Sequence, residues 1–205
     1  MIRRPPRSTL DRSSAASDVY KRQAKYEAML VDFSRDEQRQ DAYLEINPKG
    51  RVPSLVTEQG VLTETCAILV YIAQRFGPEH LASMGDPFLF GRIQEFNSYL
   101  ASTVHVAHAH RLRGARWVSD QAALVAMQKK VPDAMTQAVT LIEDELLHGP
   151  WVMGDIYTIC DPYLFTISRW LEDDGVDTGQ LPRILEHRRC MMNRSATQAA
   201  LSQVS

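Results

Sequence analysis

A change in the pattern of apolar residues near residue 77 constrains the fold of this chain more than any other feature. Before it, residues 24–77 hold short apolar runs separated by turns such as Asn47-Pro48-Lys49-Gly50, which predicts strand, helix, strand, strand, helix. After a linker at 78–86, apolar side chains recur at helical spacing. We therefore predict an α/β domain at 24–77, followed by a larger all-α domain at 87–205.

The boundaries of several elements follow from their first and last residues. Ser34 and Glu37 have the spacing of a capping box, which predicts a short helix after a strand at 26–33. Thr158 and Asp161 have the same spacing at the start of a helix in the second domain. The other elements are expected as strands at 52–56 and 61–62 and helices at 64–76, 88–113, 120–147, 181–192 and 197–204.

Residues 1–23 differ in character from the rest of the chain. They carry six basic and two acidic side chains, a net charge of +4, whereas the formal charge of the whole chain is −2, so residues 24–205 carry −6. The segment lacks the apolar region of a secretory signal and shows neither strand nor helix periodicity. Its stretches IRRPPRSTL and SSAASDVYKRQ resemble translated adapter or vector sequence. We expect residues 1–23 to be foreign to the native protein.

Composition limits the partners and the compartment. A nearly balanced charge gives no reason to expect nucleic acid or an anionic membrane as partner. No apolar run approaches the roughly 20 residues that span a bilayer. The three cysteines, Cys66, Cys160 and Cys190, are far apart and odd in number, which argues against a disulfide framework. We expect a cytoplasmic protein.

Two motifs make residues 24–205 resemble a cytosolic glutathione transferase of the bacterial, beta-like kind. The run from Asn47 to Leu55 reads NPKGRVPSL and matches the family pattern N-P-x-G-x-V-P-x-L. Glu64-Thr65 follows where the family has an acidic residue and Ser or Thr at the start of a helix. The run 157–161, YTICD, resembles the capping box of a buried helix in the family's second domain. The resemblance implies a thioredoxin-like N-terminal domain, an all-helical C-terminal domain and a homodimer.

The resemblance assigns glutathione, as co-substrate, to the α/β domain. The family's cis-proline, here Pro53, leaves the backbone of Val52 free to pair with the cysteinyl unit of glutathione. Free N–H groups at the helix start, with the Thr65 hydroxyl and the Glu64 carboxylate, suit the zwitterionic γ-glutamyl group. Arg35 matches a position where some bacterial members hold the glycine carboxylate. Each of these residues also has a possible role without a ligand. Pro53 could be a proline at the edge of a sheet, Thr65 an ordinary helix cap and Arg35 a solvated surface side chain.

Two histidines three residues apart, His105 and His108, share one face of the helix predicted at 88–113. In beta-like members a histidine at the position of His105 points toward the glutathione thiol, so the resemblance implies that His105 stabilises a thiolate. Tyr99, Ser102, His105 and His108 are expected to line the second-substrate site between the domains. Plain helix packing is an equal alternative. The spacing would also permit two metal ligands, but we identify no third ligand and expect no metal.

The residue that activates the glutathione thiol is not identifiable in the sequence. Family members carry a Ser, Cys or Tyr after a first strand, at about the place of residues 1–23. Ser8, Thr9, Ser13 and Ser14 stand near the right distance, but no apolar strand precedes them. Cys66 follows Thr65 in the first turn of a predicted helix, where a thiolate is favoured, but packing is the commoner role of a lone cysteine. We expect the chain to lack the first strand and helix of the domain and to be impaired in catalysis.

The sequence therefore predicts a glutathione transferase, an enzyme that conjugates the glutathione thiolate to a small hydrophobic electrophile. Two alternatives stay open. One is a non-catalytic binding or regulatory module with the transferase fold. The other is a glutathione-dependent isomerase of a maleyl-type substrate. The second substrate, the subclass and the dimer interface are not determined by the sequence.

Overall fold

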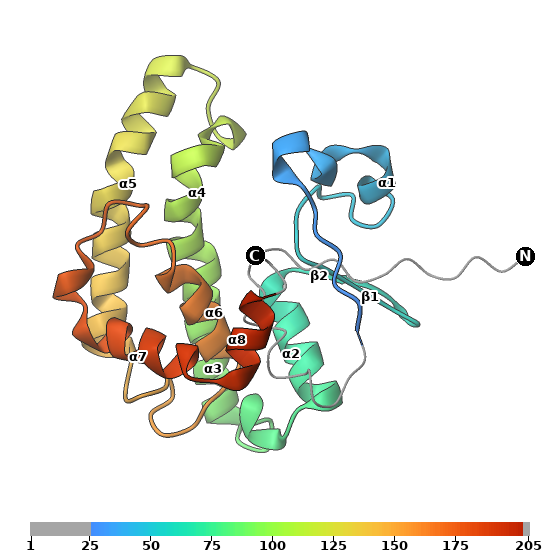
Figure 1. Cartoon of the computed structure of the whole chain (residues 1–205), viewed down its shortest axis with the longest axis vertical. Coiled ribbons are helices and arrows are strands. Elements are labelled where there is room, and N and C mark those ends of the chain that lie inside the picture. Colours follow the sequence, from blue (N-terminus) through green and yellow to red (C-terminus); the bar gives the residue numbers. More distant parts are fainter. Residues whose placement is uncertain (1–25, 203–205) are drawn as a thin grey trace, which may run out of the picture.

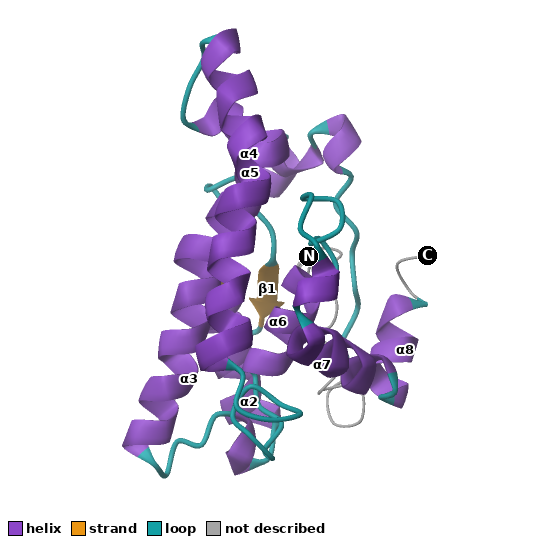
Figure 2. Cartoon of the chain, turned by 90° about the vertical axis from the view of Figure 1, so that its left-hand side faces the viewer, coloured by secondary structure: helices purple, strands orange, loops and turns teal. Residues whose placement is uncertain are grey.

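The structure, a computed structural model, describes residues 26–202, which form a small N-terminal part and a bundle of helices (Figure 1). In Figure 1 the N-terminal part, coloured blue to teal, lies beside the green to red helices of the C-terminal part. Figure 2 shows that the C-terminal part is helical almost throughout, whereas strand β1 (Ser54–Thr57) belongs to the N-terminal part. The predicted fold class, α/β followed by all-α, is confirmed.

The sheet formed by the described residues is a two-stranded antiparallel hairpin. Strand β1 pairs with β2 (Gly60–Thr63) so that Ser54 lies opposite Thr63 and Thr57 opposite Gly60. Gly60 has a φ of 140°, a conformation that suits glycine at the turn between the strands. The strands expected at 52–56 and 61–62 are confirmed, with ends displaced by one or two residues.

The strand predicted at 26–33 is wrong. In this segment Met29 forms only an isolated bridge. Met29 is 40% exposed and Leu30 is 60% exposed. A strand needs a hydrogen-bonded neighbour along its length, and in residues 26–202 the sheet consists of β1 and β2 alone. Residues apolar enough for a buried strand therefore lie at the surface.

The helix cap predicted at Ser34 is displaced by two residues. The Asp32 side chain accepts a hydrogen bond from Ser34 N at 2.8 Å, and the Glu37 carboxylate accepts one from Asp32 N at 2.8 Å. Asp32 is therefore the cap, and Glu37 accepts from its backbone N–H as the acidic residue of a capping box does, although it lies five residues on rather than three. Instead of one helix, three short elements follow, namely the 3-10 turns Phe33–Arg35 and Glu37–Arg39 and helix α1 (Asp41–Leu44).

Helix α2 (Thr65–Phe76) packs into two different apolar clusters. Ile68 and Ile72 pack against side chains of the hairpin. Leu69 and Ala73 belong to the main core, most of which comes from the C-terminal helices. The helix begins and ends within one residue of the prediction. It therefore joins the small N-terminal part to the bundle.

The helix predicted at 88–113 is one continuous helical segment with a change of winding. It comprises α3 (Pro87–Tyr99), a π-helical turn (Leu100–Val104) and α4 (His105–Arg113). The Asp86 carboxylate caps its start by accepting from the backbone N–H groups of the second and third residues beyond it, both at 3.0 Å. Such π-turns inside helices are frequent at functional sites, and this one directly precedes His105.

Helix α5 (Gln121–Leu141) runs beside α4 along the length of the bundle (Figures 1 and 2). Asp120 caps it, and the helix continues past Pro132 into a second π-helical turn, Ile142–Leu146. The segment predicted at 120–147 is confirmed. Among residues 26–202, no helix combines the length and the apolar character needed to cross a bilayer.

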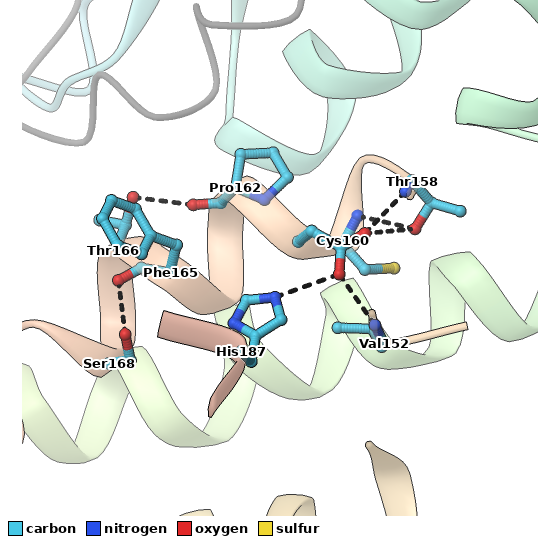
Figure 3. Close-up of polar contacts among 9 residues, drawn as sticks. Val152, Thr158, Cys160, Pro162, Phe165, Thr166, Ser168 and His187 are labelled. Carbon is cyan, nitrogen blue, oxygen red and sulfur yellow. Dashed lines mark hydrogen bonds and ion pairs between the residues drawn. The ribbon is translucent and has the colours of Figure 1, made fainter. Parts of the chain in front are cut away.

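Helix α6 (Cys160–Ser168) is buried along its whole length, and hydrogen bonds hold its N-terminus (Figure 3). The Thr158 hydroxyl accepts from Cys160 N at 3.3 Å, and the Asp161 carboxylate accepts from Thr158 N at 2.6 Å. The cap predicted at Thr158 and Asp161 is confirmed.

The carboxylate of Asp161 also connects α6 to two distant segments. Its Oδ1 accepts from Val152 N at 2.8 Å and lies 3.1 Å from Nε2 of His187 in α7 (Pro182–Met192), and both ionisable side chains are fully buried. In Figure 3 the imidazole of His187 and the backbone of Val152 converge on this point. The last helix, α8 (Ser195–Leu201), follows α7.

The segment predicted as a linker, 78–86, is packed against the bundle. It contains the 3-10 turn Glu79–Leu81, and Leu81 and Ala82 are each 2% exposed. The backbone carbonyl of Leu81 accepts from Ile159 N at 3.0 Å. The connection between the two parts therefore contributes to the main core.

Candidate functional site

A cavity of about 460 Å³ lies between the N-terminal part and the helices of the C-terminal part, a volume within the usual range for small-molecule sites. The N-terminal part contributes Phe33, Asn47, Arg51, Val52, Pro53, Glu64, Thr65 and Cys66. The C-terminal part contributes Ser98, Ala101, Ser102, His105, Val106, Ala109, Arg113, Arg116, Trp117 and Tyr163.

The N-terminal wall of the cavity presents backbone at two places. Val52 and Pro53, joined by a cis peptide bond, line it just before β1. Glu64 and Thr65 line it at the start of α2, where the first N–H groups have no acceptor within the helix. Glu64 has φ 70° and ψ 123°, a region that residues other than glycine rarely adopt and that recurs at ligand sites. This wall therefore offers hydrogen-bonding groups to a polar ligand.

The turn Asn47-Pro48-Lys49-Gly50 supports this wall from behind. Asn47 is 1% exposed, and its amide donates to the Arg51 carbonyl at 2.6 Å while accepting from Lys49 N at 3.1 Å. The ammonium of Lys49 lies 2.6 Å from the Glu64 carboxylate and donates to the Thr63 hydroxyl at 2.8 Å. The turn thus holds the backbone before Val52 and orients Glu64.

His105 and Tyr163 meet on the helical wall. Nδ1 of His105 lies 3.2 Å from the Tyr163 hydroxyl, and the imidazole packs on Trp170 with ring centroids 5.1 Å apart. Burial, and then the neighbouring His108, lowers the pKa of His105 to about 4, while burial raises the pKa of Tyr163 above its usual value. Both groups are therefore neutral at pH 7. Whichever of them donates in their mutual hydrogen bond, one N–H or O–H of the pair stays available to a ligand.

The structure brings six of the predicted site residues to the cavity. These are Val52, Pro53, Glu64, Thr65, Ser102 and His105. On the helix α3–α4 the lining positions are 98, 101, 102, 105, 106, 109 and 113, whose spacing of three and four places them on one face.

Three other predicted site residues do not line the cavity. Arg35 lies in an exposed 3-10 turn. The Tyr99 hydroxyl donates to a backbone carbonyl of α5 at 3.0 Å. His108 stacks on Trp170 and bonds through Nδ1 with the buried carboxylate of Asp174 at 2.7 Å. His108 stays beside His105, with ring centroids 6.3 Å apart, and both imidazoles pack on Trp170, but His108 does not reach the cavity.

Arg51, Arg113, Arg116, Trp117 and Tyr163 line the cavity although none of them was predicted as a site residue. Arg113 continues the helix face of His105, so extending that periodicity would have found it. Tyr163 comes from another helix, 58 residues away, and nothing local in the sequence indicates this contact.

Cys66 lines the cavity but is a poor candidate for a nucleophile. Its Sγ donates to the backbone carbonyl of Asn97 at 3.4 Å, and burial raises the pKa of its thiol. Raising that pKa reduces the thiolate fraction on which the reactivity of a cysteine depends. Within residues 26–202 no three His, Cys, Asp or Glu side chains gather in a way that could hold a metal ion.

Comparison with known proteins identifies the family. The model of the glutathione S-transferase N-terminal domain matches residues 15–74. A glutathione transferase homologue from Sulfitobacter, whose crystal structure contains bound glutathione, is 36% identical, with a TM-score of 0.89 over 97% of this chain and 98% of its own. This chain belongs to the glutathione transferase family. The predicted resemblance is confirmed.

Curated members of the family agree with this assignment. Glutathione S-transferase GST-4.5 of Xanthomonas campestris is 29% identical over 86% of this chain and 85% of its own length. Maleylacetoacetate isomerase of Pseudomonas aeruginosa is 27% identical over 78% of this chain and 76% of its own length. The family match begins at residue 15, inside the segment 1–23 predicted to be foreign. That segment lies outside the described residues, so its origin and the identity of the thiol-activating residue stay predictions.

Proposed function

We propose that this transferase binds glutathione in the cavity and conjugates its thiol to a small hydrophobic electrophile. One observation carries the proposal: Val52-Pro53 and Glu64-Thr65 line the same cavity, and His105 lines it from the C-terminal part. These are the residues that the family pattern relates to the cysteinyl unit, the γ-glutamyl group and the thiol. A single bound tripeptide could therefore contact all three groups.

The chemistry of the N-terminal wall suits glutathione. Its γ-glutamyl carboxylate would accept hydrogen bonds from the first N–H groups of α2 and from the Thr65 hydroxyl. The ammonium of the same group would pair with Glu64, which Lys49 already orients. The backbone of Val52 would pair with the cysteinyl unit as an added strand does.

The proposed reaction forms a carbon–sulfur bond. Glutathione loses its thiol proton to solvent, the thiolate attacks the electrophilic carbon, and the leaving group departs with its bonding electrons. A free thiol has a pKa of about 8.5, so only a few per cent is ionised at pH 7 without help. The free N–H or O–H of the neutral pair His105–Tyr163 would stabilise the thiolate by a hydrogen bond rather than by charge.

We also propose that the native thiol-activating residue is missing from this chain and that its turnover is low. The test is conjugation of glutathione to 1-chloro-2,4-dinitrobenzene, followed by absorbance of the thioether. This chain is compared with one in which residues 1–23 are replaced by the segment encoded upstream of Ala24 in the genome. We expect the restored chain to be about a hundredfold faster, the usual effect of one activating group. Equal rates in the two chains would contradict the proposed impairment of this chain. No turnover by the restored chain would contradict the proposed transferase activity.

A second candidate function is the isomerisation of a maleyl-type substrate. The similarity to the maleylacetoacetate isomerase of P. aeruginosa favours it. Product analysis separates the two reactions, because isomerisation returns glutathione unchanged whereas conjugation consumes it. Glutathione binding without turnover in the restored chain would instead favour a non-catalytic binding module.

We propose that the protein is a cytoplasmic homodimer. None of its three cysteines forms a disulfide, which suits a reducing compartment. Phe88 at the start of α3 is 80% exposed and Leu112 near the end of α4 is 76% exposed, and a second copy would cover such side chains. Light scattering at micromolar concentration should give the mass of two chains, and a monomer would contradict the dimer.

A further inference from the structure

Three arginines from the two parts of the chain line the cavity, and a fourth lies near them. Arg51, Arg113 and Arg116 line it, and Arg39 is close enough to Arg116 for its charge to act on that guanidinium. Burial and the like charges of Arg113, Arg51 and Arg39 lower the pKa of the Arg116 guanidinium. Among residues 26–202, no carboxylate forms an ion pair with any of the four. The cluster is therefore a concentration of positive charge without a counter-ion from the described chain.

Glutathione alone does not balance this charge. Glu64 is the one acidic residue among the described residues that line the cavity, and it is paired with Lys49. Glutathione carries two carboxylates and one ammonium, a net charge of −1 at pH 7. One guanidinium can therefore pair with the glycine carboxylate of glutathione. The positive charges of at least two other guanidinium groups then remain unbalanced. Guanidinium groups bind carboxylates through two parallel hydrogen bonds, so the remaining charge suits a second anion.

Flat apolar surfaces lie next to these guanidiniums. The Arg113 guanidinium lies 4.9 Å from the centre of the Phe33 ring. Trp117 lines the cavity beside Arg116, is 46% exposed, and has its ring 4.6 Å from that of His110 in an edge contact. A ligand with a planar apolar body and one acidic group would contact both kinds of surface.

We propose that the electrophile of this transferase carries a carboxylate, which Arg113 and Arg116 bind while its planar body packs against Trp117. The inference rests on the proposed function, since it names the class of the second substrate. The two arginines are specificity residues, distinct from the residues that hold glutathione. The preferred electrophile is then an aromatic or conjugated carboxylic acid, and an uncharged hydrophobic electrophile would react as a poorer substrate.

The test compares two probes of similar shape, the anionic 4-chloro-3-nitrobenzoate and the uncharged 4-chloro-3-nitrobenzamide. Binding is measured by equilibrium dialysis with saturating S-methylglutathione, which cannot react. Conjugation of each probe with glutathione is measured separately in the restored chain and divided by the uncatalysed rate. The variants are Arg113→Gln and Arg116→Gln. The matched control is Arg189→Gln, which removes a guanidinium from the exposed ion pair with Glu186 on α7.

We expect the carboxylate probe to bind at least about tenfold more tightly than the amide, with each cavity variant losing most of that preference and the control keeping it. A tenfold change corresponds to 1.4 kcal/mol. Equal binding of the two probes would overturn the inference. So would cavity variants that weaken glutathione binding and leave the preference intact, because the arginines would then hold the glycine carboxylate. If the carboxylate probe binds more tightly but neither probe is conjugated, the proposed transferase activity is contradicted and the anion site is kept. If both probes are conjugated but bind equally, the anion site is contradicted and the transferase activity is kept.

Discussion

The environment of His105 makes it a neutral group at physiological pH. Burial beside Tyr163 and Trp170 removes water from the imidazole, which lowers its pKa to about 4. A histidine that is exposed in the unfolded chain has a pKa near 6.5. The unfolded state therefore binds a proton between pH 6.5 and 4 that the folded state does not bind, and the free energy of unfolding falls as the pH falls through this window.

We predict that His105→Gln makes the free energy of unfolding less dependent on pH between 6.5 and 4. The largest possible difference is about 3 kcal/mol, because one pKa unit corresponds to about 1.4 kcal/mol. Urea unfolding at pH 7.5, 6, 5 and 4 measures it. His80→Gln, at an exposed position, is the matched control. Identical slopes for the His105 variant and the unmodified chain would refute the prediction.

Glu64 is predicted to contribute to glutathione binding and little to folding. The side chains of Glu64 and Lys49 are 60% and 48% exposed. An ion pair between two such surface side chains contributes at most about 1 kcal/mol to the free energy of unfolding. Glu64→Gln removes the charge that would meet the ammonium of the γ-glutamyl group. We expect the dissociation constant for glutathione, measured by calorimetry, to rise about tenfold.

Variants of Thr65 provide the comparison for this experiment. Thr65→Ser keeps the hydroxyl and should bind glutathione as the unmodified chain does, whereas Thr65→Ala should bind it more weakly. Unchanged binding in both Glu64→Gln and Thr65→Ala would mean that the start of α2 is an ordinary helix cap.

At the scale of elements, a buried hydrogen-bond network connects the start of α6 to two distant segments. Asp161 caps this helix and also binds the backbone of Val152 and the ring of His187, with all of its oxygens buried (Figure 3). Removing one partner from a buried polar network leaves the others unsatisfied, which costs more than the hydrogen bonds themselves.

We predict that Asp161→Ala lowers the free energy of unfolding by about 3 kcal/mol or more. Thr158→Ala, which removes only the cap hydroxyl, should lower it by about 1 kcal/mol. Asp133→Ala is the matched control, because Asp133 forms an exposed ion pair with Lys130 and should have an effect below about 0.5 kcal/mol. Urea unfolding measures all three, and comparable effects of Asp161→Ala and Asp133→Ala would contradict the role given to the network.

At the scale of the whole molecule, α2 connects the cavity to both apolar clusters. Its first residues line the cavity, Leu69 lies in the main core, and Ile68 lies in the small cluster beneath the hairpin. The cavity lies between the two parts, so its shape depends on this packing. Because the main core extends into α2, we expect the described parts to unfold in one transition.

Adjacent residues of α2 allow a matched test of this arrangement. Leu69→Ala should lower the free energy of unfolding by about 3 to 5 kcal/mol, since Leu69 is 1% exposed within the large core. Ile68→Ala should lower it by about 2 kcal/mol, because the small cluster includes half-buried side chains that can relax into the space. Two separate transitions, or a larger effect for Ile68, would contradict the single core.

Local patterns were sufficient for much of the fold and part of the site. The periodicity of apolar residues predicted α2, the long helix through α3 and α4, and α5, and the polar spacing of Thr158 and Asp161 predicted the cap of α6. The strand expected at 26–33 was wrong because strand pairing depends on a neighbour that apolar character alone does not supply.

The sequence by itself determined the order of α/β and all-α parts and the residues that begin α2, because those signals lie within a few residues of one another. Only the tertiary structure decided which side chains share the cavity. It paired His105 with Tyr163, gave Tyr99 and His108 partners that do not line the cavity, and brought Arg51 to the same cavity as Arg113 and Arg116. These contacts join residues tens of positions apart. They depend on how each helix is rotated against its neighbours, which is set by the packing of the whole core rather than by any local pattern.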